Sequence, residues 1–467
     1  METNHTLFEL SDDKKTLISI KNELKDTITA IIVPDGITNI KDNAFAFCDN
    51  LESITIPRSV KYIGEEAFGF CPLKAIIIEK GNPIYDSRDN CNAIIETRSN
   101  KLVLGCSNTI IPDSVISIGD YAFNGCSDLE SITIPTSVKY IGEEAFCFCS
   151  LQVITVKKGN PIYDSRDNCN AIIETRSNKL IVGCDNTIIP DSVISIGDYA
   201  FQGCELDSIT IPNSIISIGK EVFAYCSLNK ISVEHGNPTY DSRDNCNAII
   251  ETRSNKLVVG CCNTIIPDSV TSIGDYAFQQ CEFNSITIPE CVTSIGESAF
   301  SGCDFLHSIT IPNSVINIGD SAFRNCSSLK SIVISNSVAH IGDWAFSWCK
   351  SLSSVTIHSS SIEIDIYAFN QCQNIKEFIV PKGSKMQFSQ MKSLKPIRNL
   401  IKETCDHEVY SQKIVHKRNC PSCGKSLSSD FTFCPYCGAA QNKKCSGCGS
   451  TNIPTEALYC PDCGSKL

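Results

Sequence analysis

The chain has 467 residues, of which 42% are hydrophobic and 20% charged, a composition typical of folded proteins that excludes a largely disordered chain. The formal net charge of −12 is unevenly placed: residues 381–467 hold 13 Lys and Arg against 6 Asp and Glu (+7), so residues 1–380 hold 27 against 46 (−19). A segment this acidic is not expected to bind nucleic acid along its length.

The first residues show no basic region followed by an apolar stretch, and no run of 18 apolar residues occurs. The sequence therefore predicts neither a signal peptide nor a membrane span. Cysteine is frequent, with 29 residues, of which eight form four Cys-x-x-Cys pairs and most others recur at a repeat spacing. This pattern favours reduced thiols over disulfides, so we expect a cytoplasmic protein.

Residues 1–28 are predicted to form an N-terminal cap. Apolar residues gather at 7–10 and 17–20, on either side of a charged turn at 12–15. This arrangement is typical of a β-hairpin, which would protect the edge of the first strand that follows.

Residues 29–381 are predicted to form a solenoid. The string Phe-x-x-Cys recurs eleven times before residue 380, at a short spacing such as Cys303 to Cys326 or a long one such as Cys71 to Cys126. In one unit, residues 131–134 alternate Ser, Ile, Thr and Ile, which predicts a short strand that ends at Pro135. One unit is too small to bury its own apolar residues, whereas stacked copies bury them against each other.

The predicted architecture is a parallel β-sheet with short helical or irregular returns. Fifteen strands are expected, beginning near Ala30, Ser53, Ala75, Asn108, Ser131, Val153, Asn186, Ser208, Lys230, Asn263, Ser285, Ser308, Ser331, Ser354 and Glu377. The Phe and Cys columns that follow the strands are interpreted as stacked core residues, in preference to a redox or metal ladder.

Three coils are longer than the others from strand to strand, and they are nearly identical: residues 81–106, 159–184 and 236–261. Each contains Ala-Ile-Ile-Glu, Thr-Arg-Ser-Asn and Lys-Leu in succession, which predicts a β-hairpin on a four-residue turn. The hairpins are expected to project on one side. Their tips would carry a candidate partner-binding set, Arg98, Arg176 and Arg253.

The same long coils contain Asp-Ser-Arg-Asp-Asn, beginning at Asp86 and repeated at Asp164 and Asp241. A calcium loop of the EF-hand type would need a glycine and a closing glutamate that these segments lack. We interpret them as turns held by side-chain hydrogen bonds and ion pairs.

The units Ser-Ile-Thr-Ile-Pro-x-Ser-Val-x-x-Ile-Gly-x-x-Ala-Phe-x-x-Cys, together with the Asn-Pro-x-Tyr-Asp-Ser-Arg-Asp-Asn-Cys-Asn inserts, resemble the BspA-type bacterial leucine-rich repeats over about residues 29–381. The resemblance implies a leucine-rich-repeat-type solenoid. It also implies an alternative function and location, because members of that family are usually surface adhesins that bind host proteins.

The outward positions of the predicted sheet hold small hydroxyl side chains. A strip of Ser and Thr is either a neutral, soluble surface or a face for an extended partner, as solenoid faces often are. The second candidate partner-binding set comprises Ser131, Thr133, Ser208 and Thr210.

Residues 382–419 are predicted to be a basic, largely helical linker, with the helix at 384–404. Residues 420–467 resemble a double zinc ribbon, because four Cys-x-x-Cys pairs are each followed by glycine. Two such pairs supply four thiolates to one tetrahedral Zn²⁺ and leave no open position for catalysis. Two structural zinc ions are expected, with Cys420, Cys423, Cys434 and Cys437 as the ligands of one, and Cys445, Cys448, Cys460 and Cys463 as the ligands of the other.

No motif of a hydrolase, a phosphate loop or a dinucleotide site occurs, and the seven histidines are scattered. We therefore expect a non-enzymatic protein-binding scaffold whose zinc ribbons serve as a docking or capping module. Two alternatives remain: an exported surface adhesin, and a nucleic-acid-associated factor that acts through the basic tail.

Overall fold

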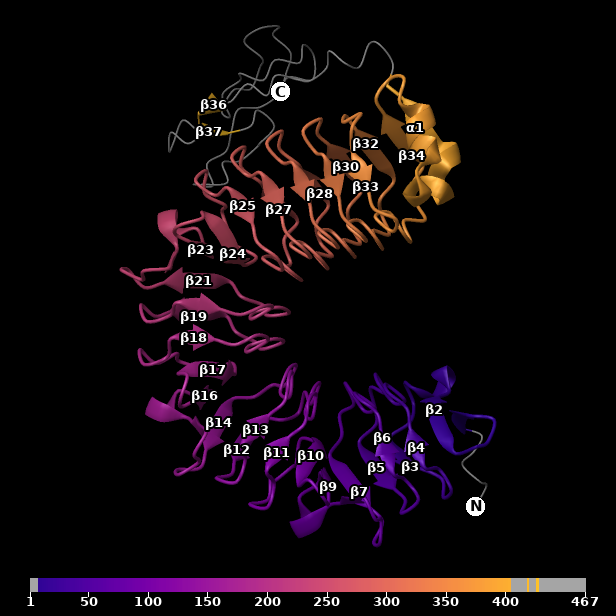
Figure 1. Ribbon diagram of the computed structural model, residues 1–467, viewed down its shortest axis with the longest axis vertical. Helices are drawn as coiled ribbons and strands as arrows, with labels where there is room; N and C mark the ends of the chain where they lie inside the picture. The colour runs from indigo at the N-terminus through magenta and orange to yellow at the C-terminus, as the bar shows by residue number, and fades with distance from the viewer. Residues whose placement is uncertain (1–6, 405–417, 420–425, 428–467) are drawn as a thin grey trace, which may run out of the picture. The chain divides into compact units, whose positions relative to one another are not determined.

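The computed structural model describes residues 7–404, 418–419 and 426–427 (Figure 1). The chain divides into two units, Met1–Lys402 and Glu403–Leu467, and the division falls within the predicted linker. Of the second unit the structure describes an antiparallel pair, β36 (Arg418–Asn419) with β37 (Ser426–Leu427). All further description concerns the first unit.

The first unit is a solenoid in which most coils contribute one longer strand to a parallel ladder. These strands are β3 (Ala30–Ile32), β5 (Ser53–Ile56), β7 (Ala75–Ile78), β12 (Ser131–Ile134), β14 (Val153–Val156), β19 (Ser208–Ile211), β21 (Lys230–Val233), β26 (Ser285–Thr287), β28 (Ser308–Thr310), β30 (Ser331–Ile334), β32 (Ser354–Ile357) and β34 (Glu377–Val380). Successive strand residues face opposite sides, so one set of side chains, largely isoleucine, is buried in the core. The outward set contains Ser and Thr together with exposed apolar residues such as Ile77, Val153 and Val333. The predicted solenoid is confirmed.

The expected strands at Asn108, Asn186 and Asn263 are wrong, and so is the single continuous sheet. The longer strands form four separate sheets, β3-β5-β7, β12-β14, β19-β21 and β26-β28-β30-β32-β34, and the last of these also includes β35 (Ile401–Glu403). In the first long coil, the hydroxyl of Thr109 accepts from the Cys106 N–H at 2.8 Å and donates to the Asn92 carbonyl at 2.6 Å. The backbone N–H groups of this segment are also engaged within the long coil, Thr109 donating to the Cys106 carbonyl and Ile110 to the Cys91 carbonyl, each at 3.1 Å. These N–H groups are therefore not available to a neighbouring strand.

A second row of strands, each of two residues, runs along another side of the coils. It comprises β4 (Asn39–Ile40), β6 (Tyr62–Ile63), β11 (Ser117–Ile118), β13 (Tyr140–Ile141), β18 (Ser195–Ile196), β20 (Ser217–Ile218), β25 (Ser272–Ile273), β27 (Ser294–Ile295), β29 (Asn317–Ile318), β31 (His340–Ile341) and β33 (Glu363–Ile364). Strands this short do not show the alternation by which strands are recognised in a sequence. The return segments predicted as irregular therefore contain regular β-structure.

Each long coil adds three antiparallel strands to this second row. They are β8 (Tyr85–Asp86), β9 (Ile94–Glu96) and β10 (Lys101–Leu104), with copies β15 (Tyr163–Asp164), β16 (Ile172–Glu174) and β17 (Lys179–Val182), and β22 (Tyr240–Asp241), β23 (Ala248–Glu251) and β24 (Lys256–Gly260). Pairing of Lys101 with Glu96 confirms the four-residue turn. β10 also pairs in parallel with β11, so the hairpin is part of the second row of strands.

The two ends of the solenoid differ in how well they were predicted. The N-terminal hairpin is confirmed, with β1 (Phe8–Leu10) antiparallel to β2 (Thr16–Ile20) and a 3-10 turn at Asn22–Leu24. The C-terminal helix is shorter than expected: α1 (Lys385–Gln390) is followed by the 3-10 segment η6 (Lys392–Leu400) and by β35 (Ile401–Glu403). Met391 adopts an extended backbone between them, and Pro396 lacks the N–H of a continuous helix.

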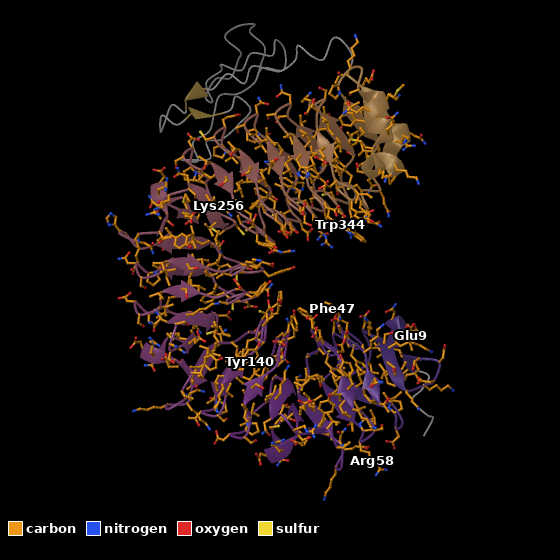
Figure 2. The ribbon with its side chains drawn as sticks, viewed as in Figure 1. Glu9, Phe47, Arg58, Tyr140, Lys256 and Trp344 are labelled. Carbon is orange, nitrogen blue, oxygen red and sulfur yellow. The ribbon has the colours of Figure 1, made fainter. Side chains whose placement is uncertain are left out.

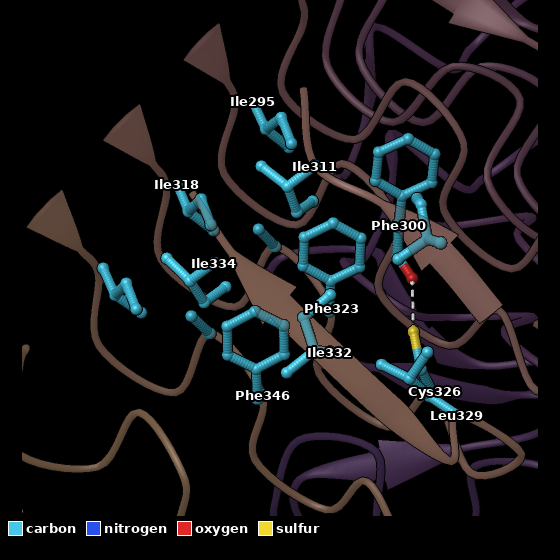
Figure 3. Packing of buried hydrophobic residues seen from close by; sticks show 14 of the residues in the cluster. Ile295, Phe300, Ile311, Ile318, Phe323, Cys326, Leu329, Ile332, Ile334 and Phe346 are labelled. Carbon is cyan, nitrogen blue, oxygen red and sulfur yellow. Dashed lines mark hydrogen bonds between the residues drawn. The ribbon is translucent and has the colours of Figure 1, made fainter. Parts of the chain in front are cut away.

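Short turns with an Ala-Phe-x-x-Cys sequence close the coils, and their phenylalanines stack through the core. Phe300, Phe323 and Phe346 lie parallel, with ring centroids 5.1 and 5.2 Å apart, and none is exposed (Figure 3). The interpretation of the Phe column as core is confirmed.

The cysteines of these turns have a role beyond filling space. Each thiol in regular coils lies within hydrogen-bonding distance of the Phe carbonyl one coil earlier, at 3.2 Å for Cys326 and Phe300 (Figure 3). Equivalent bonds of 2.9–3.2 Å join Cys71 to Phe45, Cys149 to Phe123, Cys226 to Phe201, Cys303 to Phe278, Cys349 to Phe323 and Cys372 to Phe346. Burial raises the pKa of the Cys326 thiol, which keeps it protonated as a donor. The thiols therefore supply a second donor to buried carbonyls that already accept the backbone N–H of the residue three positions later, as Phe300 does from Cys303 at 3.3 Å.

Glycine ends the hairpin strand of each long coil because an aromatic ring occupies the space of a side chain. A Cβ at Gly183 would lie 2.0 Å from Cε1 of Phe201. Gly183→Ala is expected to destabilise the solenoid by about 2 kcal/mol, since overfilled cores typically lose about 1–3 kcal/mol. Gly197→Ala is the control, because its Cβ would meet the flexible end of Lys179 at 2.9 Å. Urea denaturation of both variants measures the difference, and equal losses would contradict the ring contact.

Candidate interaction surfaces

The predicted hydroxyl strip lies on the surface but is not continuous. Ser131, Thr133, Ser208 and Thr210 are all exposed. The first two belong to the sheet β12-β14 and the last two to the separate sheet β19-β21. Each pair also has apolar or charged neighbours in register, with Val153 beside Ser131 and Lys230 beside Ser208. The structure therefore gives two short polar patches in place of one uniform face.

The predicted arginines occupy equivalent places on the three hairpin turns. Arg98, Arg176 and Arg253 are exposed, and among the described residues no carboxylate forms an ion pair with any of them. Beside each one, a serine hydroxyl bonds to the last glutamate of the preceding strand, as Ser99 does to Glu96. The hairpin turns thus hold free guanidinium groups on ordered backbone.

A network of partly buried side chains, linked by an ion pair and hydrogen bonds, fixes each of these turns. Arg88 forms an ion pair with Asp86 at 2.6 Å and donates to the Asn100 side chain at 2.7 Å. Hydrogen bonding to Asp86 raises the pKa of Arg88, so its charge is constant. Arg166 and Arg243 repeat these contacts in the other long coils. The interpretation of the Asp86, Asp164 and Asp241 segments as turns held by side chains is confirmed.

Two crevices, which the sequence analysis missed, open where long coils interrupt the column of turns. The Glu144 crevice, of about 450 Å³, is lined by Glu144, Tyr199 and Gln202 among others. The Glu221 crevice, of about 490 Å³, is lined by the equivalent Glu221, Tyr276 and Gln279. Figure 2 labels Tyr140 and Lys256, which line the first and the second respectively. Each crevice lies between two turns that are separated in the sequence by a whole long coil. The sequence does not show that these turns are neighbours, so it could not reveal the crevices.

Burial raises the pKa of one glutamate in each crevice. Desolvation, together with the nearby Glu66 and Glu143, raises the pKa of Glu144 to about 7. Desolvation also raises the pKa of Glu221, while a hydrogen bond from Gln279 opposes that shift. Both carboxylates are thus held where water solvates them poorly.

The eight predicted zinc ligands, from Cys420 to Cys463, lie outside the described residues. Within residues 7–404, 418–419 and 426–427, no group of three or more His, Cys, Asp or Glu is arranged to hold a metal ion. No helix in that same part of the chain is long and apolar enough to cross a membrane.

Two family profiles match the chain, one over the solenoid and one over the C-terminal segment. The profile described as BspA type leucine rich repeat region matches residues 23–100, 100–175, 172–246 and 260–397. The double zinc ribbon profile matches residues 416–464, and that family binds zinc. No curated protein matches the chain.

Three solved structures of bacterial proteins match this chain. A leucine rich cell surface protein from Faecalibacterium prausnitzii is 25% identical, covering 83% of this chain and 95% of its own, with a TM-score of 0.45. A leucine-rich repeat protein from Eubacterium ventriosum is 20% identical, covering 78% and 77%, with a TM-score of 0.39. The pneumococcal vaccine antigen PcpA is 19% identical, covering 83% and 92%, with a TM-score of 0.38.

Proposed function

The chain belongs to the BspA-type leucine-rich repeat family, and from this premise we propose that it is a non-enzymatic scaffold that binds another protein through its hairpin turns. The observation that supports this proposal is the threefold repetition of an exposed, unpaired arginine on a turn fixed by an Arg–Asp–Asn network. Guanidinium groups bind carboxylates through paired charged hydrogen bonds, and the ordered turn backbone limits the conformational freedom that binding would cost. The partner would therefore present acidic side chains.

The hydroxyl patches form the competing surface for the same function. Ser131, Thr133, Ser208 and Thr210 would contact an extended partner through neutral hydrogen bonds. We favour the arginines because charged hydrogen bonds are roughly twice as strong as neutral ones.

Charge reversal of all three arginines tests whether the partner binds the hairpin turns or the hydroxyl patches. Arg98→Glu, Arg176→Glu and Arg253→Glu together are expected to weaken partner capture at least about 100-fold, since each lost charged hydrogen bond contributes about 1.5–3 kcal/mol. Affinity capture with the intact chain, followed by mass spectrometry, identifies proteins retained by the wild type and lost by the variant.

The matched control applies the same charge change elsewhere on the solenoid. Lys330, Lys350 and Lys376 are exposed, and their reversal to Glu should leave capture unchanged. If both triple variants lose the same proteins, the net charge rather than the hairpin turns determines binding. Loss only on bulky substitution of Thr133 and Thr210 would favour the hydroxyl patches.

For the C-terminal part we propose two structural zinc ions. Cys420, Cys423, Cys434 and Cys437 would hold one, and Cys445, Cys448, Cys460 and Cys463 the other. The matched double zinc ribbon profile supports this assignment, and pairing in sequence order closes shorter loops than crossed pairing. Four thiolates per ion leave no position for a reacting water, so the zinc ribbons would serve as a docking or capping module.

We propose a cytoplasmic location, with the cell surface as the alternative that family membership supports. Protease treatment of intact source cells separates the two, because a surface protein is cleaved and a cytoplasmic one is protected. A role in nucleic-acid binding through the basic tail is the third candidate, and salt-sensitive retention of the full chain on single-stranded DNA would favour it.

A further inference from the structure

The two crevices share a structural cause. In regular coils, each turn donates its backbone N–H groups to the next, as Phe123 does to Ala145 at 2.8 Å. A long coil has no such turn, so the turns before and after it meet only in part. Across the Glu144 crevice, Phe148 donates to the Gln202 carbonyl at 3.1 Å, and the Cys147 thiol lies 3.6 Å from the Tyr199 carbonyl. The space beside these contacts is the crevice.

Each crevice contains an amide oxygen without a hydrogen-bond donor. Oε1 of Gln202 and Oε1 of Gln279 are both buried and unpartnered. The Gln202 side chain lines the Glu144 crevice and is only 6% exposed. A buried acceptor left without a donor costs about 1–3 kcal/mol, so a ligand that supplies a donor to either oxygen would remove this cost.

The surrounding charge is negative in both places. The Glu144 crevice is lined by Glu143, Glu144, Glu174 and Asp198 against Lys179, and the Glu221 crevice by Asp198, Glu221, Asp275 and Glu297 against Lys220 and Lys256. The formal sums are −3 and −2. Among the described residues, no basic side chain forms an ion pair with Glu144 or Glu221. A donor that also carries positive charge would complement both the orphaned oxygen and the carboxylate.

The walls of the crevices also include apolar side chains. Phe146 and Cys147 line the Glu144 crevice, and Val222 and Phe223 line the Glu221 crevice. An alkyl chain that carries an ammonium group packs its carbons on such walls while its charged end reaches the acceptors. An ammonium group has three N–H donors and no acceptor.

We propose that each crevice binds a primary alkylammonium group, which donates to the Glu144 carboxylate and Gln202 Oε1 in one crevice, and to Glu221 and Gln279 Oε1 in the other. The source is either a lysine side chain of a partner or a free diamine. This site goes beyond the proposed scaffold function and does not rest on it, because it uses none of the three hairpin arginines.

Isothermal titration calorimetry of the full zinc-loaded chain at physiological ionic strength tests the proposal with three probes. The probes are 1,4-diaminobutane, a tetralysine peptide and tetramethylammonium. Binding of the diamine assigns the site to free amines, and binding of tetralysine alone assigns it to a partner's lysine. Tetramethylammonium has the charge but no N–H, so it is expected to bind at least about tenfold more weakly. Equal binding of tetramethylammonium, or no binding of either amine, would overturn the proposal.

Two variants and a control complete the test. Glu144→Gln with Glu221→Gln is expected to weaken amine binding at least about tenfold, because two charged hydrogen bonds are lost. Glu363→Gln removes one exposed carboxylate from β33, outside both crevices, and should leave the affinity within about twofold of the wild type. An equal loss in this control would show that the amines respond to overall charge alone.

Gln202→Leu separates ligand binding from folding. The substitution removes the orphaned oxygen, so the midpoint of urea unfolding should be unchanged or higher while amine affinity at the Glu144 crevice falls about tenfold. If the variant instead unfolds more easily and amine affinity is unchanged, Gln202 Oε1 accepts a hydrogen bond from the carboxyl O–H of a neutral Glu144. That result would mean that the crevice is satisfied internally and would overturn the proposal.

Discussion

Removal of zinc from the purified chain is expected to unfold residues 420–467 and to leave the solenoid folded. This short C-terminal segment contains few large apolar side chains, and a segment so small depends on metal binding for its folding free energy. Structural zinc contributes on the order of 10 kcal/mol per site, the largest effect predicted for this chain. The solenoid keeps its structure because its thiols are buried hydrogen-bond donors and bind no metal in this interpretation.

The measurement combines elemental analysis with limited proteolysis before and after chelation. Two zinc ions per chain are expected, falling to about one in Cys423→Ser or Cys448→Ser. Cys326→Ser is the matched control, because this cysteine lies in the solenoid core and its loss should leave the zinc content at two. Chelation that exposes the solenoid to protease would show that the wrong cysteines were assigned to zinc.

Phe323→Ala is expected to cost about 3–5 kcal/mol of unfolding free energy, the usual loss for a large aromatic side chain removed from a core. Phe323 is fully buried between two parallel rings, Phe300 and Phe346. Neighbouring coils are held at their spacing by backbone ladders, so they cannot move together to close the cavity. The destabilisation should concentrate in the coils that contact this ring, because stability in a solenoid is a sum of nearest-neighbour terms.

Intrinsic fluorescence is a local reporter of that loss. The chain has two tryptophans, Trp344 and Trp348, and both lie in the turn that also contains Phe346. Urea titration followed by their emission should show a clear decrease in midpoint for Phe323→Ala. Phe305→Ala is the control, because its ring is 51% exposed and its loss should change the midpoint little. Equal midpoints in the two variants would contradict the stacked core.

The sequence by itself determined the repeated parts of the structure. The Phe-x-x-Cys period predicted stacked coils, and the alternation at Ser131–Ile134 predicted a strand with inward isoleucines, because these signals depend only on residues close together in the chain. The hairpin turn at Arg98 followed in the same way from a local four-residue pattern. The zinc ligands remain a prediction, since they lie outside the described residues.

Only the tertiary structure decided what happens where the long coils interrupt the stack. No strand forms at Asn108, where the N–H groups of Thr109 and Ile110 donate to the Cys106 and Cys91 carbonyls, and strand propensity does not indicate such bonds. The crevice at Glu144 depends on Gln202 and Tyr199, which reach it from a turn on the far side of a long coil in the sequence. The physical reason is the same in both cases: local patterns specify which segments can be strands or turns, whereas hydrogen bonding between distant segments determines which of them become neighbours and which polar atoms are left without a partner.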